Sequence, residues 1–225
     1  MSTLKCEKLH YTYTSGQQQT KAIRGIDLSF HTGTIYSIIG RSGSGKSTLL
    51  HLLSGILLPD EGNIYYDDIR INSLDQPSLS EVRRKNTGIV FQNYQLLPEL
   101  TVTENIILPS IIDHRTPDMN WAAQIMKRLE ITDIAKKHPF ELSGGQQQRV
   151  SIGRAIMNRP PFLFADEPTG NLDKKTSESV LDFLLDIKNL YAPLIILVTH
   201  DLDIARSADI VLHIEDGVLV NGGAL

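Results

Sequence analysis

Residues 40–47 form a glycine-rich loop, GRSGSGKS, whose residue types and spacing indicate phosphate chemistry. The loop matches the pattern G-x-x-x-x-G-K-[ST], in which glycines let backbone N–H groups approach phosphate oxygens closely. Lys46 is then placed to reach the β- and γ-phosphates of a nucleotide, and the Ser47 hydroxyl is placed to ligate Mg²⁺. The predicted nucleotide-binding residues of this region are Gly40, Arg41, Ser42, Gly43, Ser44, Gly45, Lys46, Ser47 and Thr48.

Two acidic residues end an apolar run in FLFADEP, residues 162–168. A buried strand would deliver Asp166 to the carboxyl edge of a sheet, where the phosphate loop is also expected. Asp166 can then hold Mg²⁺ through water, and Glu167, one residue further on, can polarise an attacking water molecule. The alternative is an ordinary acidic turn, but the accompanying phosphate loop favours the hydrolytic role.

A second helix start suited to anions is predicted in ELSGGQQQRVSIGRAI, residues 141–156. Ser143 is a favourable N-cap residue, because its hydroxyl can accept a hydrogen bond from a free backbone N–H group. Gly144 and Gly145 open the predicted helix, whose free N–H groups and dipole favour negative charge. The chain therefore has two helix starts suited to phosphate, although one phosphate loop already supplies the first.

Alternating strand and helix patterns must position these groups. Short apolar runs predict buried strands, and longer stretches with apolar residues three and four apart predict helices. The predicted strands are residues 34–40, 62–68, 162–166, 194–198 and 209–214, and the predicted helices are residues 46–55, 77–85, 120–131 and 174–190. This alternation predicts an α/β fold with a mostly parallel sheet flanked by helices.

A chain of 225 residues suits a single domain. Residues 76–158 contain few strand signals and more helical ones, so they are predicted to form a helical lobe inserted before the strand at 162. Residues 1–75 and 159–225 are then assigned to the catalytic lobe. Near the end of the chain, Asp216 and Gly217 predict the turn of a hairpin.

The overall composition narrows the class of protein. An apolar content of 41% can supply a hydrophobic core, and a net charge of −4 gives no indication of a nucleic-acid surface. A single cysteine, Cys6, cannot form an internal disulfide, which is consistent with a reducing compartment. The sequence has no apolar run near 18 residues and no signal-peptide pattern, so a cytoplasmic protein without a membrane span is expected.

Six motifs in a fixed order resemble those of the ATP-binding-cassette (ABC) ATPases across nearly the whole chain. They are the Walker A loop at residues 40–47, the Q-loop VFQNYQLLP with Gln92, the signature LSGGQ at residues 142–146, the Walker B strand with Asp166 and Glu167, the D-loop GNLD with Asp173, and the switch histidine His200 in VTHD. The resemblance implies a P-loop NTPase core with an N-terminal antiparallel β region and an inserted helical subdomain.

The resemblance also implies why the chain carries two anion-binding helix starts. In the family, two copies pack head to tail, and each ATP lies between the Walker A loop of one copy and the signature of the other. The residues expected to contact the ATP of the partner copy are Ser143, Gly144, Gly145, Gln146 and Asp173. A homodimer that encloses two ATP molecules is therefore expected.

Family roles are carried over to the matching residues. Glu167, His200 and Gln92 are expected to be catalytic, with His200 contacting the γ-phosphate and Gln92 sensing Mg²⁺ and the attacking water. Ser47, Gln92 and Asp166 are expected to hold Mg²⁺, the last through water. The expected activity is hydrolysis of ATP, and the expected cofactors are ATP and Mg²⁺.

An aromatic residue upstream of the Walker A loop stacks on adenine in this family. Tyr13 is the favoured candidate, and Tyr11 is the alternative. Alternation along a strand would place both tyrosines on the same face, so the pattern leaves both open.

The segment FQNYQLLPELTVTENIILP, residues 91–109, resembles the branch with lipoprotein-release, macrolide-efflux and antimicrobial-peptide systems. This implies a motor subunit at the inner face of the membrane, bound to a permease with few membrane helices and a large extracytoplasmic domain. The residues expected to receive a cytoplasmic helix of that permease are Tyr94, Leu96, Leu97, Pro98, Leu100 and Val102. Burial of Leu96, Leu100 and Val102 in the lobe is the alternative.

A second function remains open at this stage. A soluble ABC ATPase that acts outside transport, such as one of the iron–sulfur assembly type, would have a similar size. It would lack the resemblance in residues 91–109. In a transport complex the permease determines which molecule is transported or released, so this sequence does not identify that molecule.

Overall fold

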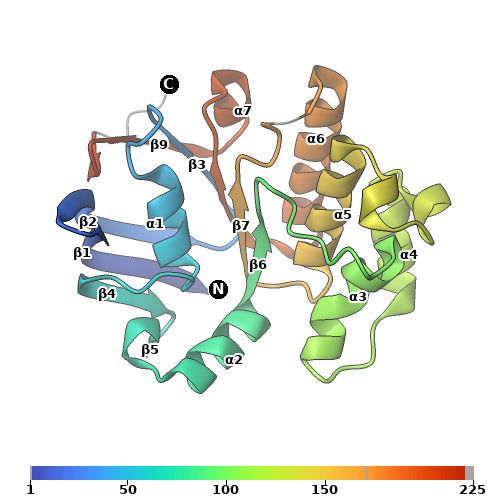
Figure 1. Ribbon diagram of the computed structural model, residues 1–225, viewed down its shortest axis with the longest axis horizontal. Helices are drawn as coiled ribbons and strands as arrows, with labels where there is room; N and C mark the ends of the chain where they lie inside the picture. Colours follow the sequence, from blue (N-terminus) through green and yellow to red (C-terminus); the bar gives the residue numbers. More distant parts are fainter. Residues whose placement is uncertain (1, 171, 221–225) are drawn as a thin grey trace.

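A mostly parallel sheet forms the centre of the fold, which is known from a computed structural model that describes residues 2–170 and 172–220 (Figure 1). The strand order is β10-β9-β3-β8-β7-β6. The strands are β3 (Ile35–Ile39), β6 (Thr87–Val90), β7 (Phe162–Asp166), β8 (Leu194–Val198), β9 (Ile210–Glu215) and β10 (Val218–Leu219). Only the pairing of β10 with β9 is antiparallel within this sheet.

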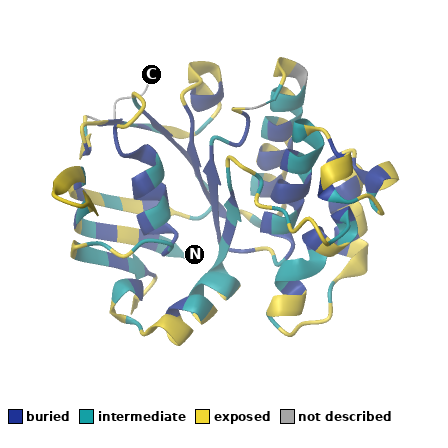
Figure 2. Cartoon of the chain, in the orientation of Figure 1, coloured by how far each residue is buried: buried dark blue, intermediate teal, exposed yellow. Residues whose placement is uncertain are grey.

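An antiparallel sheet with the order β2-β1-β4-β5 is formed mostly by the N-terminal part of the chain. Its strands are β1 (Thr3–Ser15), β2 (Gln18–His31), β4 (Glu61–Tyr66) and β5 (Ile69–Arg70). Helix α1 (Lys46–Leu53) packs between this sheet and the central one, and Figure 2 shows most of α1 as buried. The predicted α/β class, with its antiparallel N-terminal region, is confirmed.

Two hydrophobic cores cover the two faces of the central sheet, because side chains alternate along each strand. On β7, Phe162 packs with α1 and the antiparallel sheet, whereas Leu163 packs on the opposite side. The second core includes residues of α5 (Gly144–Ile156) and α6 (Lys174–Tyr191) and continues into the helical lobe. The sheet is thus held from both sides, which fixes the positions of its strand ends.

The remaining helices surround this framework. They are α2 (Gln76–Asn86), α3 (Val102–Ile112), α4 (Met119–Arg128) and α7 (Leu202–Arg206), with short 3-10 turns η1 (Ile71–Ser73), η2 (Thr132–Ile134) and η3 (Pro139–Glu141). Residues 76–158 hold α2 to α5, but they also hold β6, which pairs with β7 in the central sheet. In the ranges 2–170 and 172–220, no helix is long and apolar enough to span a membrane.

Helix α3 begins within the segment expected to receive a permease. Thr101 caps it together with Glu104, and Val102, its first residue, is 0% exposed in the core of the lobe. The prediction that Val102 contacts a permease is therefore wrong, because a fully buried side chain cannot contact a partner. Leu96 is partly buried against the same core, whereas the side chain of Leu97 is 43% exposed.

Gly88 on β6 allows the C-terminal part of α5 to approach the sheet. A β-carbon at this position would lie 2.1 Å from the carbonyl oxygen of Ala155. Real contacts of this kind do not occur, so a larger residue must push α5 away from β6.

We expect Gly88→Ala to lower the free energy of unfolding by at least about 2 kcal/mol, measured by urea denaturation, because it separates α5 from the sheet. Gly16→Ala is the matched control, since Gly16 has a φ of +59° and no neighbour within 4 Å of an added β-carbon. This control should lose only about 1 kcal/mol, the cost of left-handed backbone. Equal losses in the two variants would contradict the proposed packing.

Candidate nucleotide site

A cleft of about 660 Å³ lies where the first turn of α1 meets the carboxyl ends of β7 and β8. It brings together residues that are far apart in the sequence. The predicted site residues that line it are Tyr13, Ser42, Gly43, Gly45, Lys46, Ser47, Thr48, Gln92, Glu167 and His200. The parallel strands explain this convergence, since their carboxyl ends meet at one edge of the sheet.

The loop of residues 40–47 depends on glycine at its closest contacts. A β-carbon at Gly40 would lie 2.2 Å from the carbonyl oxygen of Ile214, and one at Gly45 would lie 2.4 Å from that of Ala22. Gly45 also has a φ of +104° just before α1 begins. The loop can therefore lie tightly against the protein while its N–H groups remain available at the start of α1.

Lys46 is largely buried, and its ammonium group lies over the loop. Its Nζ donates hydrogen bonds to the carbonyl oxygens of Gly40 at 2.9 Å and of Arg41 at 2.8 Å. Both acceptors are uncharged, so the formal positive charge is left for an anion in the cleft. This arrangement suits a triphosphate.

Ser47 and Asp166 are joined directly, although 119 residues separate them. The Ser47 hydroxyl donates a hydrogen bond of 2.9 Å to Oδ1 of Asp166. Gln92 lines the same cleft as Ser47. A hydroxyl, a carboxylate and an amide oxygen are hard ligands of the kind that Mg²⁺ prefers, so these residues could hold the ion. His51, one turn after Ser47 on α1, lies 3.8 Å from Oδ2 of Asp166.

Glu167 and His200 face each other at the ends of β7 and β8. The Nδ1 atom of His200 lies 3.0 Å from both carboxylate oxygens of Glu167. Glu167 has a φ of +46°, an uncommon value for a residue with a side chain. Its N–H group donates to the carbonyl oxygen of Val198 at 3.0 Å, which ties this turn to β8. The carboxylate is thereby held at the mouth of the cleft, where a water molecule could be activated.

The two candidate tyrosines differ in their surroundings. Tyr13 lines the cleft, is 45% exposed, and its hydroxyl lies 3.4 Å from the Thr48 hydroxyl. Tyr11 packs against the core under the antiparallel sheet and contacts the Tyr13 ring edge-to-face, with ring centres 4.9 Å apart. The surroundings of Tyr13 favour it as the residue that would stack on the adenine base of a nucleotide.

The signature residues and Asp173 do not line this cleft. The Ser143 hydroxyl accepts from the N–H of Gln146 at 3.3 Å, and Oε1 of Gln146 accepts from the N–H of Ser143 at 3.0 Å. Asp173 caps α6 and accepts hydrogen bonds from Thr176. Within one chain, Gly144, Gly145 and these three residues are thus apart from the candidate phosphate loop.

Some residues of the cleft were not predicted from the sequence. Lys21 and Arg24 on β2 line it, as do Asp216 and Gly217 in the turn between β9 and β10. The basic residues of β2 carry no motif, and only the pairing of distant segments brings them to the cleft. His51 does not line the cleft, but its Nε2 lies 3.8 Å from Oδ2 of Asp166. It had a weak signal, because it lies four residues after Ser47 and so on the same helix face.

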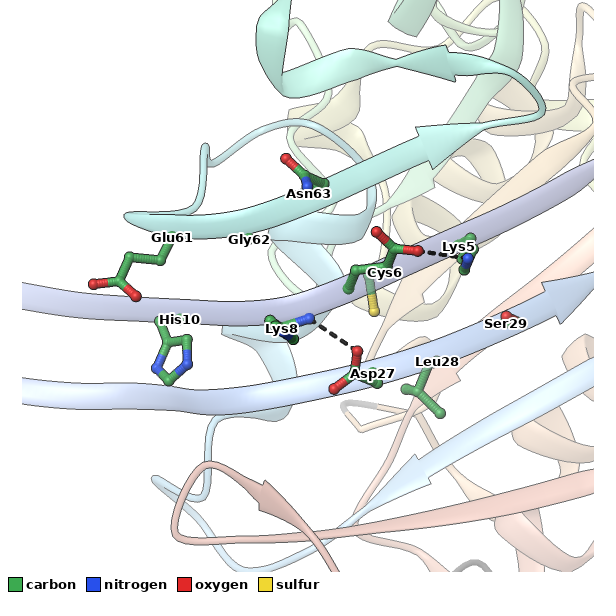
Figure 3. Close-up of a pocket in the computed structure, with 11 residues that line it drawn as sticks. Lys5, Cys6, Lys8, His10, Asp27, Leu28, Ser29, Glu61, Gly62 and Asn63 are labelled. Atoms are coloured by element: carbon green, nitrogen blue, oxygen red, sulfur yellow. Dashed lines mark hydrogen bonds and ion pairs between the residues drawn. The ribbon is translucent and has the colours of Figure 1, made fainter.

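A second cleft, of about 780 Å³, lies on the open face of the antiparallel sheet (Figure 3). Its charged groups contact one another: Lys5 pairs with Glu7, and the N–H of Lys8 donates to Asp27 at 3.0 Å. Cys6 is buried at its floor, and burial raises the pKa of the thiol to about 12, which keeps it protonated and unreactive at neutral pH. We assign this cleft no chemistry.

Comparison with known proteins gives a consistent result. The ABC transporter family matches residues 23–170. An ABC transporter ATP-binding protein of Methanocaldococcus jannaschii, MJ0796, is 38% identical over 95% of this chain and 94% of its own. The lipoprotein-releasing system ATP-binding protein LolD of Xanthomonas campestris is 37% identical over 97% of this chain and 92% of its own.

Solved structures agree with this result. The dimeric structure of the MJ0796 cassette has a TM-score of 0.93 and 37% identity, and the match covers 99% of this chain and 98% of that one. A dimeric post-hydrolysis state of the same cassette, bound to ADP and Pi, also has a TM-score of 0.93. The predicted family and fold class are confirmed, and the chain belongs to the ABC transporter family as an ATP-binding, ATP-hydrolysing cassette.

Proposed function

We propose that this chain is the motor subunit of a membrane transport complex and closes head to tail with a second copy around two ATP molecules. One observation carries the proposal: an anion-binding helix start, capped by Ser143, lies outside the cleft that holds the phosphate loop. A second copy would bring that helix start to the phosphates. The dimeric structures of a relative 37% identical over almost the whole chain support this arrangement.

The residues of the cleft then have distinct roles in binding ATP and Mg²⁺. The loop of residues 40–47 and Lys46 bind the triphosphate, Tyr13 meets the adenine, and Ser47, Asp166 and Gln92 hold Mg²⁺. Bound Mg²⁺ supplies charge neutralisation at the phosphate oxygens. Across the dimer, the partner's Ser143, Gly144, Gly145 and Gln146 complete the enclosure, and Asp173 shapes the loop that reaches the opposite site.

Glu167 is the proposed general base. Its carboxylate accepts a proton from water as the water oxygen attacks the γ-phosphorus, and the bond from that phosphorus to the bridging oxygen of ADP breaks, so that ADP and phosphate are the products. His200, 3.0 Å from the carboxylate, orients Glu167 and is positioned to contact the γ-phosphate. When the γ-phosphate leaves, the group that joins the two copies is lost, and the dimer can open.

The helical lobe is proposed to transmit this closure. The Q-loop that contains Gln92 is tied to α5, because the Arg154 guanidinium donates to the carbonyl oxygens of Tyr94 at 2.8 Å and Gln95 at 2.6 Å. Movement of the signature helix is therefore coupled to the Q-loop. We assign residues 76–158 to this lobe, and residues 1–75 and 159–225 to the catalytic lobe, within one domain.

A permease is proposed to dock beside the Q-loop. A groove of about 430 Å³ lies between α2, β6 and α3, and it is lined by residues that include Arg83, Phe91, Gln95, Leu108 and Ile112. It suits a short amphipathic helix, with Tyr94, Leu96, Leu97, Pro98 and Leu100 as neighbouring contacts. Relatives named as lipoprotein-releasing system proteins support the lipoprotein-release or macrolide-efflux type of permease, which would hold this chain at the cytoplasmic face of the membrane.

We expect Glu167→Gln to lower ATP turnover by about 10²–10⁴-fold, because it removes the general base. The variant should still bind ATP and should accumulate as a dimer with ATP and Mg²⁺, measured by light scattering after gel filtration. A variant that remained monomeric at saturating ATP would contradict the ATP-enclosing dimer.

We expect Ser143→Arg to leave nucleotide binding by the monomer within about twofold, because Ser143 lies outside the chain's own cleft. Turnover should fall by at least about 10²-fold, since a hydroxyl that stabilises the partner's γ-phosphate is replaced by a bulky side chain. Fluorescent ATP-analogue titration and phosphate release measure the two effects. Loss of binding by the monomer would count against a role in trans.

Leu97→Asp tests the permease surface, because the Leu97 side chain is exposed and lies two residues after Gln95, which lines the groove. Co-expressed with a permease of the lipoprotein-release type, this variant should lose at least about tenfold in complex formation by placing a charge in an apolar contact. ATP-driven dimerisation of the isolated chain should persist. The control Leu190→Asp changes a side chain that is 52% exposed on α6 and should form the complex normally. If Leu97→Asp leaves the complex intact, the permease docks elsewhere. If the unsubstituted chain forms no complex with the permease, a soluble, non-transport ATPase is favoured.

A further inference from the structure

Phe140 presents an aromatic ring to solvent three residues before Ser143 of the signature. It is 76% exposed, the largest exposed fraction among the large hydrophobic residues that the structure describes. A single exposed apolar residue needs no explanation by itself. Its support, its neighbours and its distance from the signature therefore decide whether this ring has a role.

The turn that carries the ring is fixed by its own hydrogen bonds. Phe140 lies in η3 (Pro139–Glu141), where the Glu141 carboxylate accepts from the N–H group of His138 at 2.7 Å. The N–H group of Glu141 donates to the carbonyl oxygen of His138 at 3.0 Å. Pro139 and Leu142, on either side of Phe140 and Glu141, are buried. A ring on such a support loses little conformational entropy when it makes a contact.

One face of the Phe140 ring is already covered by a neighbour. The His138 ring stacks on it, with ring centres 5.5 Å apart and planes 10° from parallel. Because Phe140 is nevertheless 76% exposed, the opposite face of its ring is open. A ring with one supported face and one open face is a platform on which another planar aromatic group can stack.

The nucleotide cleft offers adenine only one such platform. Among the described residues that line the cleft, Tyr13 is the single Phe, Tyr or Trp residue. An adenine that stacks on Tyr13 therefore has a second face without an aromatic partner from the same chain. Stacking of a base on an aromatic side chain contributes about 1–3 kcal/mol, so a second platform would add appreciably to binding.

The signature of a second copy would carry Phe140 toward that open face. In the proposed dimer, Ser143 of one copy meets the γ-phosphate held by the other. Three residues of chain span at most about 10 Å, so Phe140 stays close to the nucleotide that Ser143 contacts. The ring is then within reach of the part of the nucleotide beyond its phosphates.

The charges around Phe140 also suit a nucleotide. Lys136 and Lys137 are exposed just before the turn. Glu141 is the one acid between residues 134 and 146, and its carboxylate accepts the hydrogen bond from His138. A positively charged surface beside an open aromatic ring attracts a polyanion that also carries a base.

We propose that Phe140 stacks on the adenine of the ATP bound to the other copy, on the face opposite Tyr13. This inference rests on the proposed function, since it requires head-to-tail closure. Each adenine lies between Tyr13 of one copy and Phe140 of the other. The base, as well as the triphosphate, thereby joins the two copies.

The first test places Phe140→Ala in the Glu167→Gln chain. The ATP concentration for half-maximal dimer, measured by light scattering, should rise at least about fivefold because a stacking partner is lost. Binding of ATP by the monomer should stay within about twofold, since Phe140 does not line the cleft of its own chain. Phe140→Trp keeps a ring and should dimerise within about threefold of the parent. The melting temperature of Phe140→Ala should change by less than about 2 °C, because the side chain is exposed.

A second readout reports on the base itself. The triphosphate of 2-aminopurine riboside replaces ATP, because its fluorescence falls when the base stacks on an aromatic ring. Emission should fall on binding to the monomer and fall further when the Glu167→Gln chain dimerises. Phe140→Ala should lose this further fall at nucleotide concentrations that saturate its dimer.

Met119→Ala is the matched control. Met119 is 51% exposed in the same helical lobe, but it lies at the start of α4. This variant should keep both the dimerisation and the fluorescence change of the parent.

Two results overturn the inference. Unchanged dimerisation of Phe140→Ala would place the ring outside the ATP-enclosing interface, as expected if it contacts a permease instead. Weaker dimerisation with the parent's fluorescence change in the dimer would mean that the ring packs on protein of the second copy and not on the base. If the Glu167→Gln chain itself fails to dimerise, the proposed function has failed, and this is seen before any Phe140 variant is compared.

Discussion

The hydrogen bond of 2.9 Å between Ser47 and Asp166 joins the phosphate loop to the end of β7 in the candidate nucleotide site, and it depends on the parallel register of the central sheet. Strand β8 separates β3 from β7, and the three strands run in the same direction. Their carboxyl ends therefore meet at one edge, which gathers the phosphate loop, two acids and a histidine. Cores on both faces of the sheet hold that edge in place.

The groups at this edge of the sheet would surround a bound triphosphate only in part. Lys46 and the start of α1 approach it from one side, and Glu167 with His200 stands beside it, but the signature helix start lies elsewhere on the chain. A second copy resolves this asymmetry, because each copy has one half-site of each kind. Enclosure of the nucleotide and association of the subunits then become one event, which in the proposed function gives ATP control over the spacing of two docked permease segments.

Local motifs could be predicted from the sequence, whereas features that depend on tertiary pairing could not. The phosphate loop, the acids after β7 and the capped start of α5 each lie within a few consecutive residues, so their chemistry is visible in the order of residue types. Strand β6 has only four residues, and it becomes a strand by pairing with β7. Helix α3 escaped prediction because apolar residues occur on all its sides and Pro109 lies within it.

Residues that the sequence pattern treats as equivalent could be told apart only from the fold. Tyr11 and Tyr13 were equivalent by alternation, but Tyr11 packs against the core while Tyr13 lines the cleft. Burial likewise removed Val102 from the predicted docking surface and left Leu97 exposed.

The most direct measurement of the central claim is a crystal structure of the Glu167→Gln variant with ATP and Mg²⁺. We predict that each γ-phosphate lies within hydrogen-bond distance of Lys46 from one copy and Ser143 from the other. Signature residues that face solvent in every arrangement of copies would contradict it.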